Sequence, residues 1–155
     1  MSSPNKEIHP SDSTPQKNAE VEMRILLQKK LGCDLKPETI RNKAGESLEI
    51  DGYSESALIL CEIYAHIGAL KGSQPRKPLA DSVKMVIAEK WLGKKYRKIF
   101  VFADAEAAKG FQSGSWQTEA MKFLEVETMV VSLASDTREL VVKTQRKQNM
   151  GNQPK

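Results

Sequence analysis

Two acidic residues in the first half of the chain, Asp51 and Glu62, carry side chains that could do chemistry. The segment 48–53 alternates like a β-strand, which predicts Asp51 on one face together with Glu49 and Tyr53. Glu62 follows eleven residues later, inside a mostly apolar segment. Burying a carboxylate is costly unless a cation or hydrogen-bond donors meet it, so a functional site is favoured over an accident of sequence.

The apolar segment 57–66 is predicted to be the next strand, and its period of two places Glu62, Tyr64 and His66 on one face. His66 is therefore a candidate catalytic general base or phosphate contact. The alternative is a purely structural role, which is the more common one for a single histidine near the end of a strand.

The segment 71–98 follows the second acid and is strongly basic. It holds nine Lys and Arg residues against two acids, a net charge of +7, whereas the whole chain carries only +4. Such asymmetry is typical of a protein that binds a polyanion, which makes nucleic acid the expected partner. A solvated helix face and a lysine-rich loop are the alternative explanation. Carboxylates beside excess lysine suggest a metal-assisted phosphodiester site.

The composition, with 39% hydrophobic and 28% charged residues in a chain of 155, indicates a soluble globular protein. No apolar run approaches the roughly 20 residues of a membrane span, and the N-terminus lacks the apolar core of a signal peptide. We therefore expect a cytoplasmic protein with no membrane partner, and a homo-oligomer stays open. Cys33 and Cys61 form no CxxC pair and are expected to be reduced packing residues.

The periodicity predicts an α/β fold in which a mixed β-sheet is flanked by helices in the order αβββαβαβα. Residues 1–18 and 148–155 are expected to be disordered tails around a single domain, 19–147. Trp91 and Trp116 are expected in the core, and Asp104 is expected to cap a helix. The predicted elements are a helix at 19–31, strands at 36–42, 46–53 and 57–66, a helix at 78–91, a strand at 98–103, a helical segment at 106–124 that breaks near 112–115, a strand at 126–133 and a helix at 135–147.

This order of elements, with Asp51 after a hairpin, Glu62 on the next strand and a helix directly after it, resembles the restriction-endonuclease-like PD-(D/E)XK nuclease superfamily. The resemblance covers about 19–147, and its motif is short. It implies a restriction-endonuclease-like fold and assigns Asp51 and Glu62 as ligands of Mg²⁺ or Mn²⁺. In parts of the superfamily an acid of the first helix adds an outer ligand; Glu20 and Glu22 are the residues in that position here, and we expect both to be solvated instead.

The superfamily pattern has a lysine two residues after the second acid, where this chain has Tyr64. A neutral phenol with a pKa near 10 cannot supply the missing positive charge. The resemblance implies that the lysine can come from a neighbouring element, and Lys77 and Lys84 are seven residues apart on one face of the following helix. Loss of catalysis, with the fold kept for binding, is the alternative.

The loop before that helix is predicted to contact nucleic acid. Lys71, Gln74, Arg76 and Lys77 precede or begin the helix, whose N-terminus carries partial positive charge, and together they could cradle a backbone phosphate. The sequence therefore predicts a metal-dependent nuclease that cleaves DNA or RNA. A catalytically inactive protein of the same fold, which binds nucleic acid or a protein, is the second hypothesis, and an unrelated α/β domain with a small anionic ligand is the third.

Overall fold

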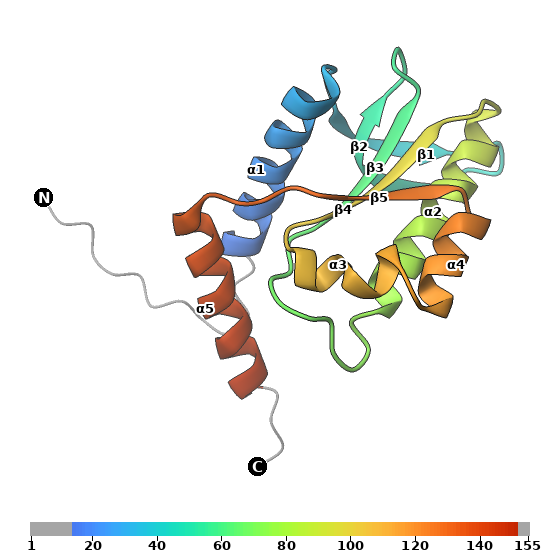
Figure 1. Ribbon diagram of the computed structural model, residues 1–155. Coiled ribbons are helices and arrows are strands. Elements are labelled where there is room, and N and C mark those ends of the chain that lie inside the picture. Colours follow the sequence, from blue (N-terminus) through green and yellow to red (C-terminus); the bar gives the residue numbers. More distant parts are fainter. Residues whose placement is uncertain (1–13, 152–155) are drawn as a thin grey trace, which may run out of the picture.

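A computed structural model describes residues 14–151 as one five-stranded sheet with helices on both faces (Figure 1). The α/β class and the order of elements predicted from the sequence are confirmed, including the break of the segment 106–124 into two helices. In chain order the elements are α1 (Thr14–Leu31), β1 (Lys36–Arg41), β2 (Ser47–Ser54), β3 (Ile59–Tyr64), α2 (Arg76–Leu92), β4 (Arg97–Phe102), α3 (Ala105–Gln112), α4 (Trp116–Phe123), β5 (Val126–Val130) and α5 (Ser135–Gly151).

The order of the strands across the sheet is the same as their order along the chain. Strands β1, β2 and β3 form an antiparallel meander, and β4 and β5 then join parallel to β3. The sheet is therefore mixed, and its central strand β3 is buried at all six residues. A strand covered on both faces has to be almost wholly apolar, which is why Glu62 stands out within it.

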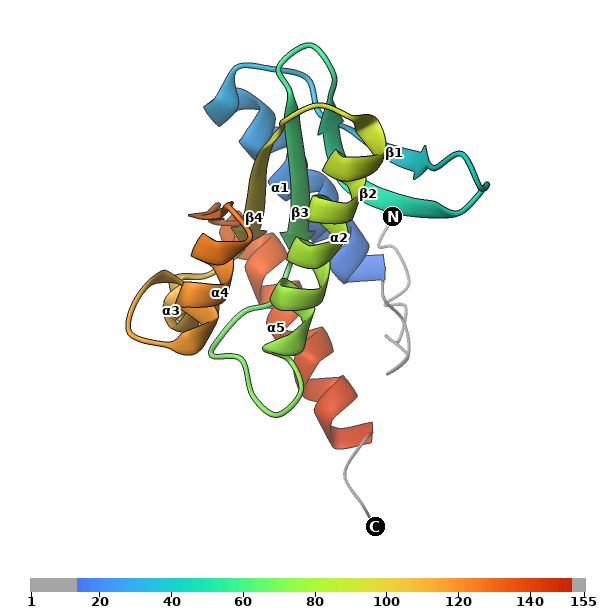
Figure 2. The same cartoon turned by 90° about the vertical axis from the view of Figure 1, so that its right-hand side faces the viewer.

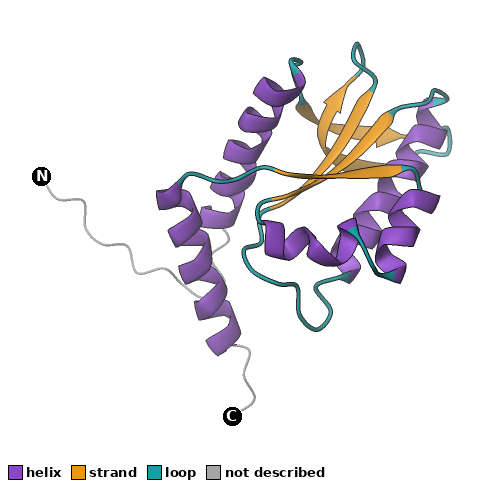
Figure 3. Ribbon diagram, in the orientation of Figure 1, coloured by secondary structure: helices purple, strands orange, loops and turns teal. Residues whose placement is uncertain are grey.

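Two layers of helices cover the two faces of the sheet (Figure 3). Helices α1 and α5 lie together on one face, where Met23, Leu27 and Val141 pack against Ile63 and Val101. Helices α2, α3 and α4 lie on the other face, and Figure 2 shows α2 running along β3. The core on that second face is rich in aromatic side chains, among them those of Tyr64, Phe100, Phe102 and Phe111.

Local sequence signals set several of the boundaries. Gly45 adopts a positive φ of 87° in the turn between β1 and β2, and the Asn42 side chain accepts the N–H of Glu46 beside it. Helix α2 ends at Leu92 and is capped by Gly93, which adopts the left-handed conformation and donates its N–H to the carbonyls of Glu89 and Lys90.

Three expectations need correction. Helix α1 begins at Thr14 and α5 continues to Gly151, so five residues of the expected N-terminal tail and four of the C-terminal one are helical. The remaining tail residues, 1–13 and 152–155, lie outside the described part of the chain. Trp116 is 66% exposed, so its assignment to the core is wrong. The buried side of α4 carries Met121 instead, which packs into the core on that face of the sheet.

Candidate active site

Strands β2 and β3 bring Asp51 and Glu62 together. Gly52 pairs with Cys61 in the antiparallel register, so the next pair along the two strands is Asp51 and Glu62. The Asp51 carboxylate also accepts the backbone N–H of Ile63, with an N to Oδ2 distance of 2.9 Å. Glu62 is 1% exposed, which makes it the most deeply buried acid of the described chain. The predicted proximity of the two acids is thus present in the structure.

A β-bulge in β2 orients Asp51. Lys36 pairs with Tyr53 but Glu38 pairs with Ile50, so Asp51 and Gly52 together face the single residue Pro37 of the edge strand β1. Bulges re-aim side chains and are common beside active sites, and an edge strand tolerates proline at such a point.

The bulge also changes the simple alternation expected for 48–53. Ile50 and Tyr53 are three residues apart, yet both pack in the aromatic core on the α2 face, and Glu49 is exposed. The predicted common face of Glu49, Asp51 and Tyr53 is therefore wrong for Glu49. The extra residue shifts the parity of the strand, and only the pairing with β1 reveals it.

Helix α2 supplies the lysine that the strand motif lacks. Lys84 Nζ lies 3.0 Å from Glu62 Oε1 and 4.0 Å from Asp81 Oδ1. Lys77, two helical turns earlier, pairs with the other oxygen of Asp81 at 3.0 Å, and its Nζ lies 5.5 Å from the ring centre of Tyr64. Of the two lysines suggested by the sequence, Lys84 contacts the buried Glu62, whereas Lys77 contacts Asp81 and the ring of Tyr64.

The charge around Glu62 is not balanced. Burial, together with the nearby charge of Asp51, raises the pKa of Glu62 to about 9, although Lys84 acts in the opposite direction. The contact with Lys84 is an ion pair without hydrogen-bond alignment, and Glu62 Oε1 is the only buried side-chain oxygen or nitrogen within residues 14–151 that has no hydrogen-bond partner. An acid in this state gains much from a further cation.

The two acids of α1, Glu20 and Glu22, have different surroundings, and neither is fully solvated as expected. Glu22 accepts the N–H of Ala134 at 3.2 Å and the hydroxyl of Thr137 at 3.1 Å, so it caps the start of α5. Glu20 is partly buried, and burial followed by the charge of Asp51 raises its pKa. Glu20 is thus coupled electrostatically to Asp51, so the expectation that it is solvated is wrong.

His66 lies beyond the end of β3 and away from the acids. It is 7% exposed, and its ring packs on Tyr64 with a centroid separation of 5.4 Å. Burial lowers the pKa of His66, against a hydrogen bond with the backbone of Ala69. None of the hydrogen bonds within the described residues joins His66 to Asp51 or Glu62, so no contact supports direct proton transfer between His66 and the acids.

The basic segment 71–98 does not form one continuous surface. Three cations of its second half are paired, Lys95 with Glu125 at 3.2 Å, Arg97 with Glu127 at 2.7 Å and Lys98 with Glu89 at 2.7 Å. A formal charge of +7 along the sequence therefore overstates the local positive potential, because Glu125 and Glu127 lie outside the counted segment.

The first half of that segment keeps its exposed cations. Lys71 and Arg76 are exposed at the loop and at the first residue of α2. Gln74, expected to contact nucleic acid, uses its side-chain oxygen to accept the N–H of Lys71 at 2.8 Å, which closes the loop on itself. Lys71 and Arg76 are therefore exposed cations of this region that form no ion pair within residues 14–151.

Asp51 and Glu62 carry carboxyl oxygens, the type of ligand that a hard divalent cation prefers. No group of three or more His, Cys, Asp or Glu side chains within residues 14–151 is arranged to hold a metal. Mg²⁺ usually keeps several waters and takes one or two carboxylates together with phosphate oxygens. The carboxyl groups of Asp51 and Glu62 supply adjacent oxygen ligands, and the Oε1 atom of Glu62 has no hydrogen-bond partner within the described residues. They match the protein share of such a coordination sphere.

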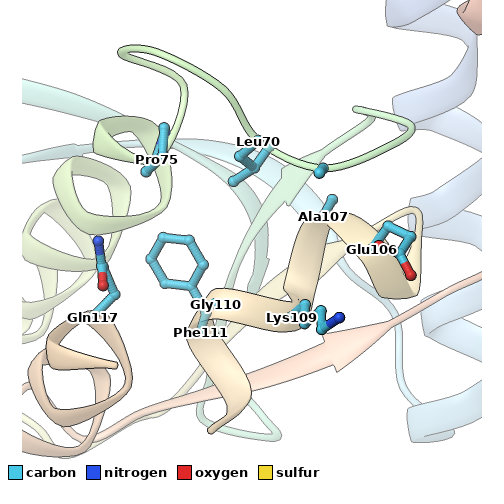
Figure 4. A pocket seen from close by; sticks show the side chains of 9 residues that line it. Leu70, Pro75, Glu106, Ala107, Lys109, Gly110, Phe111 and Gln117 are labelled. Carbon is cyan, nitrogen blue, oxygen red and sulfur yellow. The ribbon is translucent and has the colours of Figure 1, made fainter. Parts of the chain in front are cut away.

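An apolar pocket of about 390 Å³ lies between the loop after β3 and helices α3 and α4 (Figure 4). The ring of Phe111 projects into it, Leu70 and Pro75 form the side toward the loop, and Gln117 faces it from α4. None of the residues predicted from the sequence to do chemistry lines this pocket. It is therefore separate from the acids and Lys84.

No family model matches this sequence, and no curated protein is similar to it. None of the helices within residues 14–151 is both long and apolar enough to cross a membrane. Both cysteines are free, as expected, and burial raises the pKa of the Cys61 thiol to about 12, which leaves it unreactive at neutral pH. Because no family model or curated protein matches the sequence, the proposed function rests on the geometry of the acids and lysines.

Proposed function

We propose that the protein is a metal-dependent nuclease that cleaves phosphodiester bonds of DNA or RNA. The observation that carries this proposal is the position of Lys84, whose ammonium lies 3.0 Å from a buried glutamate that neighbours a second carboxylate. Three elements, β2, β3 and α2, converge to place these groups. The PD-(D/E)XK pattern that the sequence resembles has the same three groups, but its lysine lies on the strand instead of the helix.

Asp51 and Glu62 would hold Mg²⁺ or Mn²⁺. Such an ion supplies Lewis-acid stabilisation of phosphate oxygens and a lower pKa for a bound water. The chain's own contribution is to keep two oxygen donors side by side. The bulge at Asp51 and Gly52 and the N–H of Ile63 fix one carboxylate, while the buried central strand fixes the other.

Lys84 is assigned the role of the missing strand lysine. Its side chain is 31% exposed, so its ammonium sits at the border between the buried acid and solvent, where a water and a phosphate can reach it. A cation there favours the ionised form of Glu62 and the attacking hydroxide. Lys77 is assigned a supporting role, because its ammonium is held by Asp81 and lies over Tyr64.

A non-catalytic protein of the same fold that binds nucleic acid or a protein is the second candidate. The observation that favours it is Tyr64, an apolar-packed phenol at the strand position of the superfamily lysine. Burial raises the pKa of Tyr64 further, so it is neutral at physiological pH. In this second candidate Lys84 only neutralises a buried acid.

The test compares two lysines of the same helix. In assays with Mg²⁺ or Mn²⁺ on duplex and single-stranded DNA and RNA, Lys84→Ala is expected to lower cleavage about 10²-fold or more. The matched variant Lys77→Ala changes the same residue type seven positions earlier and is expected to retain most activity. Asp51→Asn and Glu62→Gln should each abolish cleavage and metal binding while circular dichroism stays unchanged.

Tyr64→Lys separates the two candidates. In an active enzyme with its lysine on α2 this change should add little, whereas in a binding protein that lost only its lysine it could create cleavage. If wild type and Tyr64→Lys are both inert on every nucleic acid, and calorimetry detects no binding of Mn²⁺ to either, the nuclease proposal is wrong.

A further inference from the structure

A second, polar pocket of about 360 Å³ lies at the end of β3, between the loop 65–75 and helix α5. Its lining includes His66, Lys71 and Gly72 from the strand end and loop, and Gln145 and Asn149 from α5. We refer to it as the loop–α5 pocket. It differs from the apolar pocket of Figure 4, which lies on the α3 and α4 side of the same loop.

The walls of the loop–α5 pocket are fixed by hydrogen bonds that join elements far apart in the sequence. The Gln145 amide accepts the N–H of Ile67 at 2.8 Å and donates to the Ile67 carbonyl at 2.9 Å. Asp104 accepts the N–H of Gly68 at 2.7 Å and is itself contacted by Arg138 of α5 at 3.4 Å. Helix α5 therefore holds the start of the loop both directly and through Asp104.

The rest of the loop is closed around Lys71. The side chain of Gln74 accepts the N–H of Lys71, and Gly72 adopts a positive φ of 60°, a conformation that favours glycine. The backbone of Lys71 is thereby fixed while its side chain stays exposed. Because this backbone is already ordered, binding an anion at Lys71 costs little backbone entropy, and the cost is limited to ordering the lysine side chain.

The charge around this pocket is positive. Its lining contains Lys71 and no acidic residue. The second half of α5, which supplies Gln145 and Asn149 to the lining, has no acid after Glu139, whereas its Lys143 and Arg146 line a separate pocket. Asp104 lies behind this lining, where it accepts the N–H of Gly68 and is paired with Arg138. The chemistry favours a small anion with several oxygens, for which lysine and amide donors are suitable partners.

We propose that the loop–α5 pocket binds a backbone phosphate of the nucleic-acid strand, at a fixed distance from the acids of the nuclease site. This inference rests on the proposed function and deepens it. His66 follows Glu62 by four residues, which corresponds to about 13 Å along an extended strand. A phosphate in the pocket is therefore a neighbour, along the same strand, of the phosphate that Glu62 faces, and not the one that is cleaved.

The test uses the full chain in EDTA, so that binding is measured without cleavage. Lys71→Ala is expected to weaken the Kd for a labelled oligonucleotide about 5-fold to 10-fold and to reduce the slope of log Kd against log salt by about 1. Asn149→Asp, which introduces a negative charge at the rim, should weaken binding further. Lys109→Ala, an exposed lysine at the other pocket, is the matched control and should change neither quantity.

A methylphosphonate scan locates the contacted phosphate. One neutral linkage should weaken wild-type binding as much as Lys71→Ala does, and the two changes together should weaken it no further. Additive losses at every position would overturn the proposal. Inorganic phosphate should bind far more weakly than the oligonucleotide; equal affinity would assign the pocket to a free anion and would also overturn it.

The two proposals can fail separately. If wild type cleaves but Lys71→Ala and Asn149→Asp bind as wild type does, the pocket is not a phosphate site and the nuclease stands. If no cleavage occurs with any metal but binding depends on Lys71 and on one phosphate, the nuclease proposal is wrong and the pocket stands. Melting curves of both variants confirm that each compared protein is folded.

Discussion

Helix α2 makes two ion pairs with the strands that it covers, and their polarity is opposite. In one pair Lys84 of the helix approaches Glu62 of β3 at 3.0 Å, and in the other Glu89 of the helix approaches Lys98 of β4 at 2.7 Å. In each pair the strand residue is almost fully buried, with side-chain exposures of 2% for Glu62 and 1% for Lys98. The two pairs are thus a matched comparison within one helix.

The pair of Glu89 and Lys98 is balanced. Glu89 Oε2 accepts both the ammonium of Lys98 and the N–H of Tyr96, at 2.7 Å and 2.8 Å. Burial acts to raise the pKa of Glu89, but these two donors outweigh it, and the pKa is lowered. The pair of Glu62 and Lys84 has a second carboxylate beside it, and the pKa of Glu62 is raised to about 9. Satisfied buried charge indicates structure, and unsatisfied buried charge indicates a site that expects a ligand.

The largest effect is expected from breaking the balanced pair. Glu89→Gln retains an acceptor for Tyr96 but leaves the buried ammonium of Lys98 uncompensated, so the free energy of unfolding should fall by about 3–5 kcal/mol. Urea denaturation measures this. The double variant Glu89→Gln with Lys98→Met is the control, because it removes both charges and should recover most of the loss. A fall below about 1 kcal/mol in the single variant would contradict the assignment of this pair to stability.

A smaller effect of opposite sign is expected at the unbalanced pair. The pKa of Glu62 rises from its usual 4.5 to about 9 on folding, so the neutral acid is favoured in the folded state. Its contribution to stability is complete below pH 4.5 and is lost as the pH rises toward 9. Without divalent metal, Glu62→Gln should therefore be more stable than wild type at pH 8, by about 1–3 kcal/mol.

The measurement for Glu62→Gln is a series of urea titrations between pH 5 and pH 9 in EDTA. The wild-type free energy of unfolding should decline with pH more steeply than that of the variant, and the two curves should converge near pH 5. Parallel curves would show that Glu62 is ionised in the folded protein, and the contrast between the two ion pairs would then disappear.

The smallest effect is expected at an exposed ion pair, which serves as a reference for the two buried pairs. Arg97 and Glu127 form a bidentate pair at 2.7 Å and 3.0 Å, but both side chains are nearly half exposed. Water and salt screen such pairs, so Arg97→Met should lower the free energy of unfolding by about 0.2–1 kcal/mol, and less in high salt. A loss as large as that of Glu89→Gln would mean that burial does not separate these pairs.

The sequence predicted the strands and helices well because their apolar periods are long and clear. It placed Asp51 and Glu62 on adjacent strands, and it named Lys84 as one of two lysines that could reach back from α2. It could not choose between Lys77 and Lys84, because that choice depends on how the helix is rotated on the sheet.

Other features were hidden for physical reasons that no local pattern reveals. The bulge opposite Pro37 depends on pairing between two strands, although a proline in an edge strand is a weak signal for it. The approach of Glu20 depends on where α1 crosses the sheet. The neutralisation of Lys95 and Arg97 depends on Glu125 and Glu127, which lie thirty residues away. Net charge along a segment cannot report such contacts.

The strand order β1-β2-β3-β4-β5 has a consequence for how the chain reaches this state. Because every strand pairs with its neighbour in the sequence, the sheet can grow one strand at a time: the antiparallel β1–β2–β3 meander uses short connections and can form early, whereas the parallel pairings of β4 and β5 cross over helices and are slower. Closing the β2–β3 hairpin is enough to bring Asp51 to the backbone of Ile63, twelve residues away. Lys84 arrives only when α2 docks. The chain therefore brings its two carboxyl groups together early on its folding route, and Lys84 joins them in a later step.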